Sequence, residues 1–128
     1  MVTAAVADTS IFIARETNRP FRTELPERLA VSIITIGELR AGVLVASDVE
    51  TRARRLTTLT AALHLDPLPV DDEVARAWSE LRVRLRDIGR RMPVNDSWIA
   101  ATAIAWGHSI VTQDDDYIDI PGLTVIRV

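Results

Sequence analysis

Short apolar segments alternate with longer amphipathic segments along the whole chain. The apolar segments are predicted to be strands: Thr3–Asp8, Arg28–Ile33, His64–Pro69, Ser109–Thr112 and Leu123–Val128. Strands separated by helices form parallel sheets that are covered by helices on both faces. The predicted fold class is therefore α/β, with three layers and a central, mostly parallel sheet.

Helices are predicted over 35–46, 48–63, 71–88 and 95–106. The helix over 71–88 has the clearest periodicity, with a stripe of Val74, Trp78, Leu81, Leu85 and Ile88. In the helix over 35–46, the apolar face consists of Ile36, Leu39, Val43 and Leu44. Asn95 is predicted to cap the start of the last helix, and Gly107 to end it. Asp48/Arg52 and Glu50/Arg54 have the spacing of ion pairs on one helix face.

The composition describes one globular domain over residues 1–128. The chain is 48% hydrophobic with a mean hydropathy of +0.13, which excludes a disordered chain. No apolar run is long enough to span a membrane, and Met1–Ala7 lacks the basic start and cleavage site of a signal peptide. The absence of cysteine suits a reducing compartment, so we expect a cytoplasmic protein.

Acidic residues stand where the predicted strands and helices meet. Asp8 ends the first strand, and Asp114 lies two residues past the strand Ser109–Thr112. Asp96 falls in the first turn of a helix, and Glu38 lies early in a helix that follows a strand directly. Because ligands bind beyond the carboxyl ends of parallel strands, we expect these four side chains at one edge of the sheet.

Clustered carboxylates raise one another's pKa unless a cation neutralises them. A set of oxygen ligands suits Mg²⁺, for which Mn²⁺ can substitute, rather than zinc, and the two histidines have no zinc-site spacing. Such ions orient a phosphodiester and activate a water for attack on it. The pattern therefore indicates a hydrolytic nuclease.

Each acid also has a structural explanation. Asp8 is in the position of a helix N-cap, and Asp96 complements a helix dipole. Glu38 and the run 114–116 suit solvated surfaces. Considered only by composition and spacing, the residues leave both interpretations open.

The same residues carry a resemblance to a known family. The four motifs occur in order along the chain as Asp8-Thr9-Ser10, Glu38-Leu39-Arg40-Ala41-Gly42, Asp96-Ser97-Trp98-Ile99-Ala100-Ala101 and Thr112-Gln113-Asp114-Asp115-Asp116-Tyr117. Pro121-Gly122-Leu123 ahead of the last strand fits as well. Together they resemble the PIN-domain family, and specifically the VapC-like toxins of bacterial toxin–antitoxin pairs.

This resemblance implies a Mg²⁺-dependent endoribonuclease that is homodimeric and is neutralised by a small VapB-like antitoxin. Asp8 and Asp96 would bind the metal most directly. Glu38 and Asp114 would hold its waters or act as a base. Asp116 is counted with the catalytic residues, but the family varies at this motif, so the resemblance does not specify whether Asp116 contacts the metal. Asp115 would point to solvent.

Ser10 and Thr112 would either donate hydrogen bonds into the site or cap the backbone. Capping is the favoured interpretation.

A row of arginines marks a second candidate surface. Arg82, Arg86 and Arg90 are spaced four residues apart, and the predicted pairs Glu80/Arg84 and Asp87/Arg91 leave this row unneutralised. The row is either a solvated face or a surface for RNA phosphates or an acidic antitoxin segment, with Arg82 and Arg86 as the substrate-binding candidates. The net charge of −3 by itself argues weakly against nucleic-acid binding.

Apolar side chains suggest a further surface. Leu39, Val43, Leu44 and the face over 56–63 suit either the core or the binding of an amphipathic antitoxin helix. The tryptophans, Trp78, Trp98 and Trp106, are predicted to pack in the core or in a dimer rather than to stack on bases.

Two other α/β classes also place an aspartate after the first strand. Haloacid-dehalogenase-like phosphatases and receiver domains both require a lysine. All fifteen basic residues here are arginine, which excludes both classes. The remaining alternative to a nuclease is a PIN-like module that binds without turnover.

Overall fold

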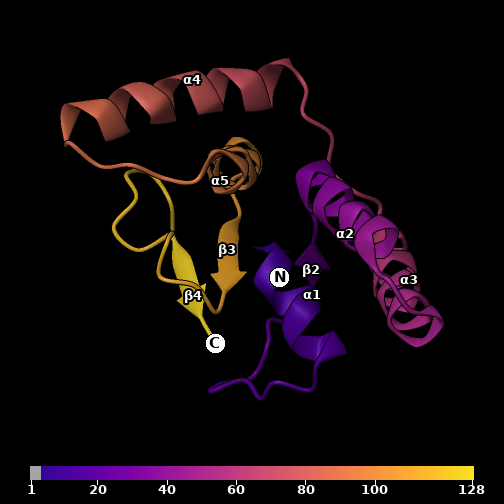
Figure 1. Cartoon of the computed structure of the whole chain (residues 1–128). Helices are drawn as coiled ribbons and strands as arrows, with labels where there is room; N and C mark the ends of the chain where they lie inside the picture. Colours follow the sequence, from indigo (N-terminus) through magenta and orange to yellow (C-terminus); the bar gives the residue numbers. More distant parts are fainter. Residues whose placement is uncertain (1–3) are drawn as a thin grey trace.

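The computed structural model describes residues 4–128. The elements follow the predicted alternation of strands and helices (Figure 1). In chain order they are β1 (Ala5–Ala7), α1 (Thr9–Glu16), β2 (Leu29–Ala30), α2 (Ile33–Val45), α3 (Val49–Leu63), α4 (Asp72–Asp87), α5 (Val94–Trp106), β3 (Ser109–Thr112) and β4 (Val125–Arg127).

The sheet has four strands in the order β2-β1-β3-β4, and every neighbouring pair is parallel. β1 is central, with Ala5 beside Leu29 on one side and Ser109 on the other. The predicted α/β class is confirmed. Since all strands run in one direction, their carboxyl ends meet at one edge of the sheet.

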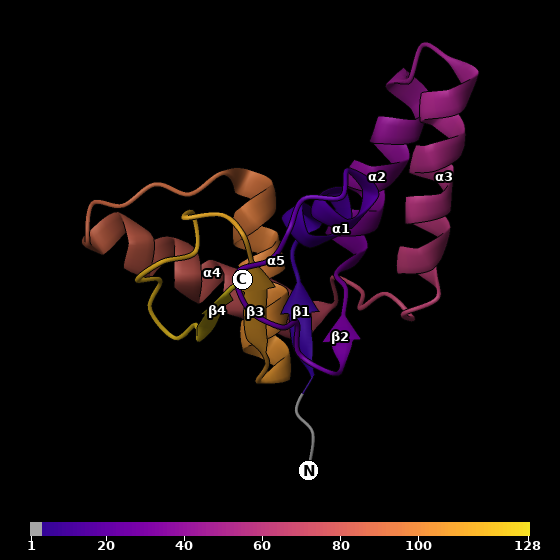
Figure 2. The same cartoon turned by 90° about the horizontal axis from the view of Figure 1, so that it is seen from below.

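Helices cover both faces of the sheet (Figures 1 and 2). Successive side chains of a strand point to opposite faces, so Ala5 and Ala7 pack in a core with α1, α2 and α3. Val6 points the other way, into a core with α4 and α5. Figure 2 shows the α2–α3 hairpin extending away from the sheet. Within residues 4–128, no helix is long and apolar enough to span a membrane.

Several strands are shorter than predicted. β2 covers only Leu29–Ala30, because α2 starts at Ile33, and the predicted Thr3 lies outside the described residues. The segment 64–69 forms one isolated bridge, between Leu68 and Ser32. Pro67 and Pro69 flank that bridge and have no N–H to extend the ladder.

The helix boundaries agree with the sequence pattern to within one residue, except that α2 starts at Ile33 rather than at Thr35. Asp48 and Asp71 cap α3 and α4 through their side chains, and Gly107 ends α5 with a φ of 67°. The prediction that Asn95 caps α5 is wrong, because the helix already begins at Val94 and Pro93 occupies the cap position. Asn95 is thereby left inside the first turn, with its side chain available for a tertiary contact.

None of the four predicted i,i+4 ion pairs forms in the part of the chain that the structure describes. Arginine is long enough to find other partners. Arg52 donates to the Ala46 carbonyl at 2.8 Å, Arg54 pairs with Glu16 at 3.7 Å, and Arg86 pairs with the adjacent Asp87 at 3.6 Å. Of these contacts, the Arg86–Asp87 pair is exposed on both sides and contributes little to stability.

Some side chains expected in the core lie on the surface. Leu44 is 75% exposed and Ile88 is 57% exposed, because each stands at the end of its helix, beyond the neighbouring element. Trp78 and Trp98 stack at 4.3 Å, as core packing requires. Trp106 is 49% exposed, so of the two predicted places, the core and a dimer interface, the core is excluded.

Candidate active site

Asp8 follows β1 directly and is almost completely buried. Its backbone occupies the cap position of α1, but its side chain makes no capping hydrogen bond. Instead, the Asp8 carboxylate accepts a hydrogen bond of 2.5 Å from the Ser10 hydroxyl. The explanation of Asp8 as a helix cap is therefore wrong, and a buried carboxylate with so little hydrogen bonding requires another reason.

Glu38 reaches the same edge from α2. Its carboxylate accepts a hydrogen bond of 2.6 Å from Thr9, whose hydroxyl also lies 3.0 Å from that of Thr35. The second oxygen of Glu38 lies 3.5 Å from the side-chain amide of Asn95 on α5. Glu38 thus bridges three helices at the start of α1, which excludes a freely solvated side chain.

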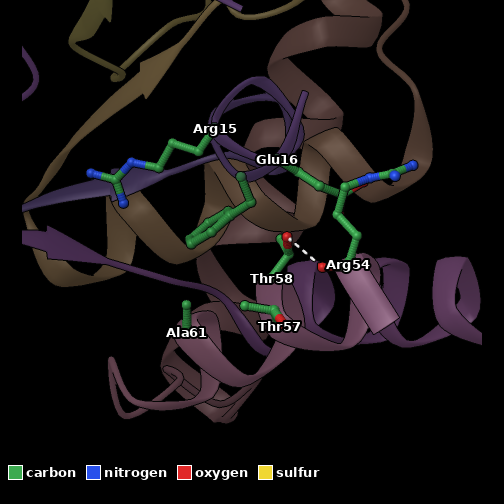
Figure 3. Close-up of a pocket in the computed structure, with 7 residues that line it drawn as sticks. Arg15, Glu16, Arg54, Thr57, Thr58 and Ala61 are labelled. Carbon is green, nitrogen blue, oxygen red and sulfur yellow. Dashed lines mark hydrogen bonds and ion pairs between the residues drawn. The ribbon is translucent and has the colours of Figure 1, made fainter. Parts of the chain in front are cut away.

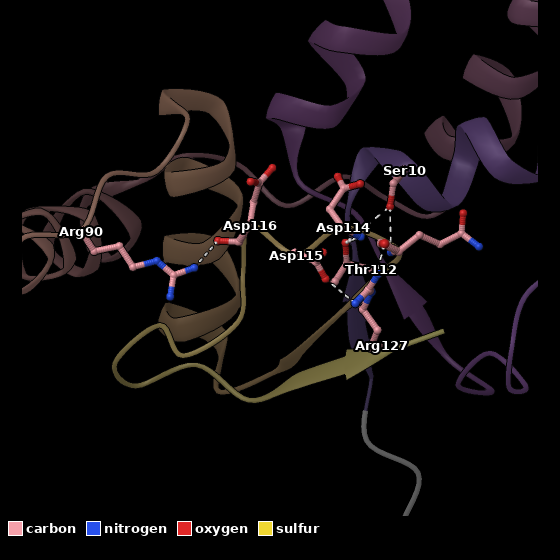
Figure 4. Close-up of polar contacts among 8 residues, drawn as sticks. Ser10, Arg90, Thr112, Asp114, Asp115, Asp116 and Arg127 are labelled. Atoms are coloured by element: carbon pink, nitrogen blue, oxygen red, sulfur yellow. Dashed lines mark hydrogen bonds and ion pairs between the residues drawn. The ribbon is translucent and has the colours of Figure 1, made fainter.

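The loop after β3 brings its acids to this edge from below (Figure 4). The Thr112 hydroxyl accepts a hydrogen bond of 2.9 Å from the backbone N–H of Asp114. In Figure 4 the Asp114 and Asp116 side chains point in the same direction, with Asp114 beside Ser10, whereas Asp115 points away from them and pairs with Arg127. Asp115 is mostly exposed, as predicted.

The carboxylates influence one another electrostatically. Burial raises the pKa of Asp8 to about 7; the Ser10 hydrogen bond opposes this, and the charges of Asp114 and Asp96 add to it. Burial and the neighbouring Asp116 carboxyl raise the pKa of Asp96 to about 6, with a further contribution from Glu38. Burial and the charge of Asp116 also raise the pKa of Asp114. The five predicted acids therefore form one cluster of like charges.

Tyr117 lies buried beside the carboxylates of the cluster. Its side chain is fully buried, and its hydroxyl has no hydrogen-bond partner in residues 4–128. Burial, and then the negative charges of Asp8 and Asp96, raise the pKa of this hydroxyl. The hydroxyl lies close to the Asp96 carboxyl and lowers the pKa of that acid, against the effect of burial, so Tyr117 belongs to the cluster.

The donor set fits Mg²⁺ or Mn²⁺. Every side chain in the cluster offers oxygen, which hard cations prefer. No three acidic or histidine side chains in the described part of the chain stand close enough to enclose an ion by themselves. Mg²⁺ does not need such a cage, because it keeps several waters and binds through one or two carboxylates. Asp8 and Asp96 are the candidates for direct ligation.

A family model described as PIN domain matches residues 5–123. The chain belongs to the PIN-domain family. Ribonuclease VapC4 of Mycobacterium tuberculosis is 48% identical over 132 residues, which cover 99% of this chain and 98% of that protein. Ribonuclease VapC5 of the same organism is 44% identical over 126 residues, with 98% and 93% covered.

Solved structures agree with this assignment. The PIN domain described here superposes on a chain from the crystal structure of VapBC-5 of Mycobacterium tuberculosis with a TM-score of 0.88. The two chains are 42% identical, and the match covers 98% of this chain and 99% of the other. The resemblance noted in the sequence is thereby confirmed.

Several polar residues of this PIN domain make contacts at the site that the sequence left open or did not show. Ser10 and Thr112 both serve the site and the backbone: Ser10 donates to Asp8 and accepts from the Gln113 N–H at 3.1 Å. Thr9 stands inside the first motif, which was the one available signal for its contact with Glu38. Asn95 precedes Asp96 but was interpreted as a cap. Its position beside Glu38 follows only from the packing of α5 against α2.

Proposed function

We propose that this PIN domain is a Mg²⁺-dependent endoribonuclease that acts in the cytoplasm as the toxin of a toxin–antitoxin pair. The observation that carries the proposal is the cluster of carboxylates at the carboxyl edge of the sheet, with raised pKa values at Asp8, Asp96 and Asp114. Maintaining that repulsion costs stability, which a bound cation would recover. The names of the two mycobacterial relatives support the reaction class.

The side chains divide the chemistry between them. Asp8 and Asp96 would bind the cation, and Ser10 fixes the orientation of the Asp8 carboxylate. When bound, the ion supplies positive charge to the phosphate and lowers the pKa of an attacking water. Glu38, oriented by Thr9, and Asp114, held through its backbone by Thr112, would orient that water or take its proton.

RNA would reach this edge beside the end of α4. A cavity of about 270 Å³ is lined there by Arg82, Leu85, Arg86, Gly89, Arg90 and Arg91. Arg82 lies over the Trp78 ring at 5.5 Å, and Arg86 pairs with its exposed neighbour Asp87. These arginines remain available for phosphates, although Arg86 is less free than the sequence suggested.

Replacing Arg82 and Arg86 together by alanine should weaken RNA binding uniformly and reduce the salt slope of log Kd by about 2. The measurement is RNA affinity between low and moderate salt, together with KM for cleavage. Arg22→Ala is the matched control, because Arg22 is also an exposed arginine but does not line this cavity. Unchanged RNA affinity, antitoxin binding and salt dependence in the double variant would exclude this surface.

An antitoxin segment would bind between α1 and the α2–α3 hairpin. A cavity of about 470 Å³ there is lined by apolar Ile13, Leu39 and Val45 and extends to Glu38. A second cavity of about 360 Å³ continues between α1 and α3 and shares Glu16 and Arg54 with the first (Figure 3). The groove carries both apolar and charged groups, as an amphipathic helix requires. This PIN domain superposes on one chain of VapBC-5, which is a member of a family of toxin–antitoxin systems. That similarity supports an antitoxin as the partner.

Cleavage of RNA with and without divalent ions tests the proposal directly. The purified protein should cut RNA internally with Mg²⁺ or Mn²⁺ and lose the activity in EDTA, with recovery when the ion is restored. Mapping of new RNA 5′ ends after induction in cells would identify the target. A protein that binds RNA or a partner tightly but gives no new ends with either ion would instead be a binding module without turnover.

A further inference from the structure

The acidic loop between β3 and β4 has no regular secondary structure of its own. It carries Asp114, Asp115, Asp116 and Asp119 within six residues, so its charges repel one another. Asp116 is itself exposed, and its backbone belongs to no helix or strand. Contacts from residues outside the loop are therefore needed to hold the Asp116 backbone in place against this repulsion.

Two arginines hold the loop from opposite sides (Figure 4). Arg127 on β4 donates to the Gln113 carbonyl at 3.0 Å, and its guanidinium also binds the Asp115 carboxylate. Arg90, after the end of α4, donates through one nitrogen to the Asp116 carbonyl at 3.2 Å. Its other terminal nitrogen donates to the Ile118 carbonyl. The backbone is thereby fixed on both sides of the Asp116 side chain.

We propose that Arg90 and Arg127 are positioning residues, which hold the backbone of the acidic loop so that Asp114 and Asp116 face Asp8 and Asp96. This proposal rests on the proposed nuclease function. Arg90 uses two separate nitrogens for two carbonyls two residues apart, a pattern that the planar guanidinium provides and a lysine ammonium does not. Arg127 in addition neutralises Asp115, the acid of the run that faces away from the site.

This assignment separates Arg90 from the other arginines at the end of α4. Arg90 lines the same cavity as Arg82, Arg86 and Arg91, but its side chain is half-buried and bonded to the loop. Arg91 is exposed and makes no ion pair or side-chain hydrogen bond within residues 4–128. A residue that only attracts RNA would affect KM, whereas a residue that positions Asp116 acts on metal binding and on kcat.

The test compares Arg90→Gln, Arg90→Lys and Arg127→Gln with the control Arg91→Gln. The first readout is amide hydrogen exchange of residues 113–119 in the metal-free protein, which should rise at least about fivefold in Arg90→Gln and Arg127→Gln without a change in Tm. The second is the Kd for Mg²⁺ in the absence of RNA, which should weaken by about 10-fold or more. In RNA cleavage, kcat should fall by a similar factor at unchanged KM. Arg90→Lys should restore none of these values. Arg91→Gln, in the same cavity but without a hydrogen bond to the loop, should leave loop exchange, Mg²⁺ affinity and kcat at their wild-type values and should change only KM.

Each other outcome overturns the assignment. Unchanged loop exchange in Arg90→Gln and Arg127→Gln would show that the arginines do not hold the loop. Faster exchange with unchanged Mg²⁺ affinity and kcat would show that holding the loop does not position the acids, and a rise in KM alone would make Arg90 an RNA contact. If the wild-type protein itself neither binds Mg²⁺ nor cuts RNA, the proposed function fails, while the exchange data still decide whether the arginines hold the loop.

Discussion

Replacing Asp96 by asparagine should lower the rate of RNA cleavage by a factor of about 10² to 10⁴ while raising the stability of the metal-free protein. Activity falls because asparagine keeps the shape of the side chain but removes the charge that would hold the cation. Stability rises because burial and Asp116 disfavour the ionised Asp96 carboxyl, whose pKa is raised to about 6. The measurements are single-turnover cleavage with Mg²⁺ and Tm in EDTA at neutral pH, where Tm should increase by about 3 °C.

Asp119→Asn is the matched control for this substitution. Asp119 lies in the acidic loop, is exposed and has a φ of 58°, a conformation that asparagine tolerates. It should change neither cleavage nor Tm. If Asp96 served only the dipole of α5, its replacement would lower Tm slightly and leave cleavage intact. That result would contradict the catalytic role of Asp96.

The positions of the acids could be predicted because they depend on strand ends. β3 was predicted with its observed bounds, since the β-branched residues 110–112 lie between Gly107, which ends a helix, and the acidic loop that starts at Gln113. Asp8 and Asp114 then follow from the rule that parallel strands end at one edge. The structure adds that Asp8 does not cap α1, which only the geometry of its side chain decides.

The hydrogen bonds around the acids were not predictable from the sequence. The contact between Thr9 and Glu38 joins residues 29 positions apart, and it depends on how α1 and α2 pack. Arg90 was placed in an exposed row by its spacing, but the end of α4 directs it to the loop carbonyls instead. Long polar side chains have many partners within reach, so spacing along one helix does not determine which partner they bind.

The acids of the site could be predicted from the sequence, whereas the residues that position them could not. Carboxylates that repel one another are conspicuous, because no fold needs them together. The groups that make their arrangement possible, Ser10, Thr112 and the two loop arginines, are ordinary polar residues with ordinary spacing. A motif therefore identifies the charged groups, and the structure identifies what holds them in place.

The stability of the metal-free protein should fall as pH rises from 5 to 8. The pKa of Asp8 is raised to about 7 in the folded state from 3.8 in an unfolded chain. Between these values the folded protein holds a proton that the unfolded chain has lost, so the stabilisation is complete below pH 4 and disappears above pH 7. From Asp8 alone, the loss of stability between pH 5 and pH 8 is on the order of 3 kcal/mol at most. Chemical denaturation in EDTA at several pH values measures it.

Asp8→Asn isolates this contribution from the other titrating groups, because the variant cannot gain or lose the proton. Its stability in EDTA should depend less steeply on pH than that of the wild type, and the two curves should converge near pH 4. Saturating Mg²⁺ should stabilise the wild type more at pH 8 than at pH 5, since protons compete with the cation for Asp8. Parallel pH curves for wild type and variant would mean that Asp8 ionises normally in the fold. The electrostatic argument for a cation at this edge of the sheet would then be lost.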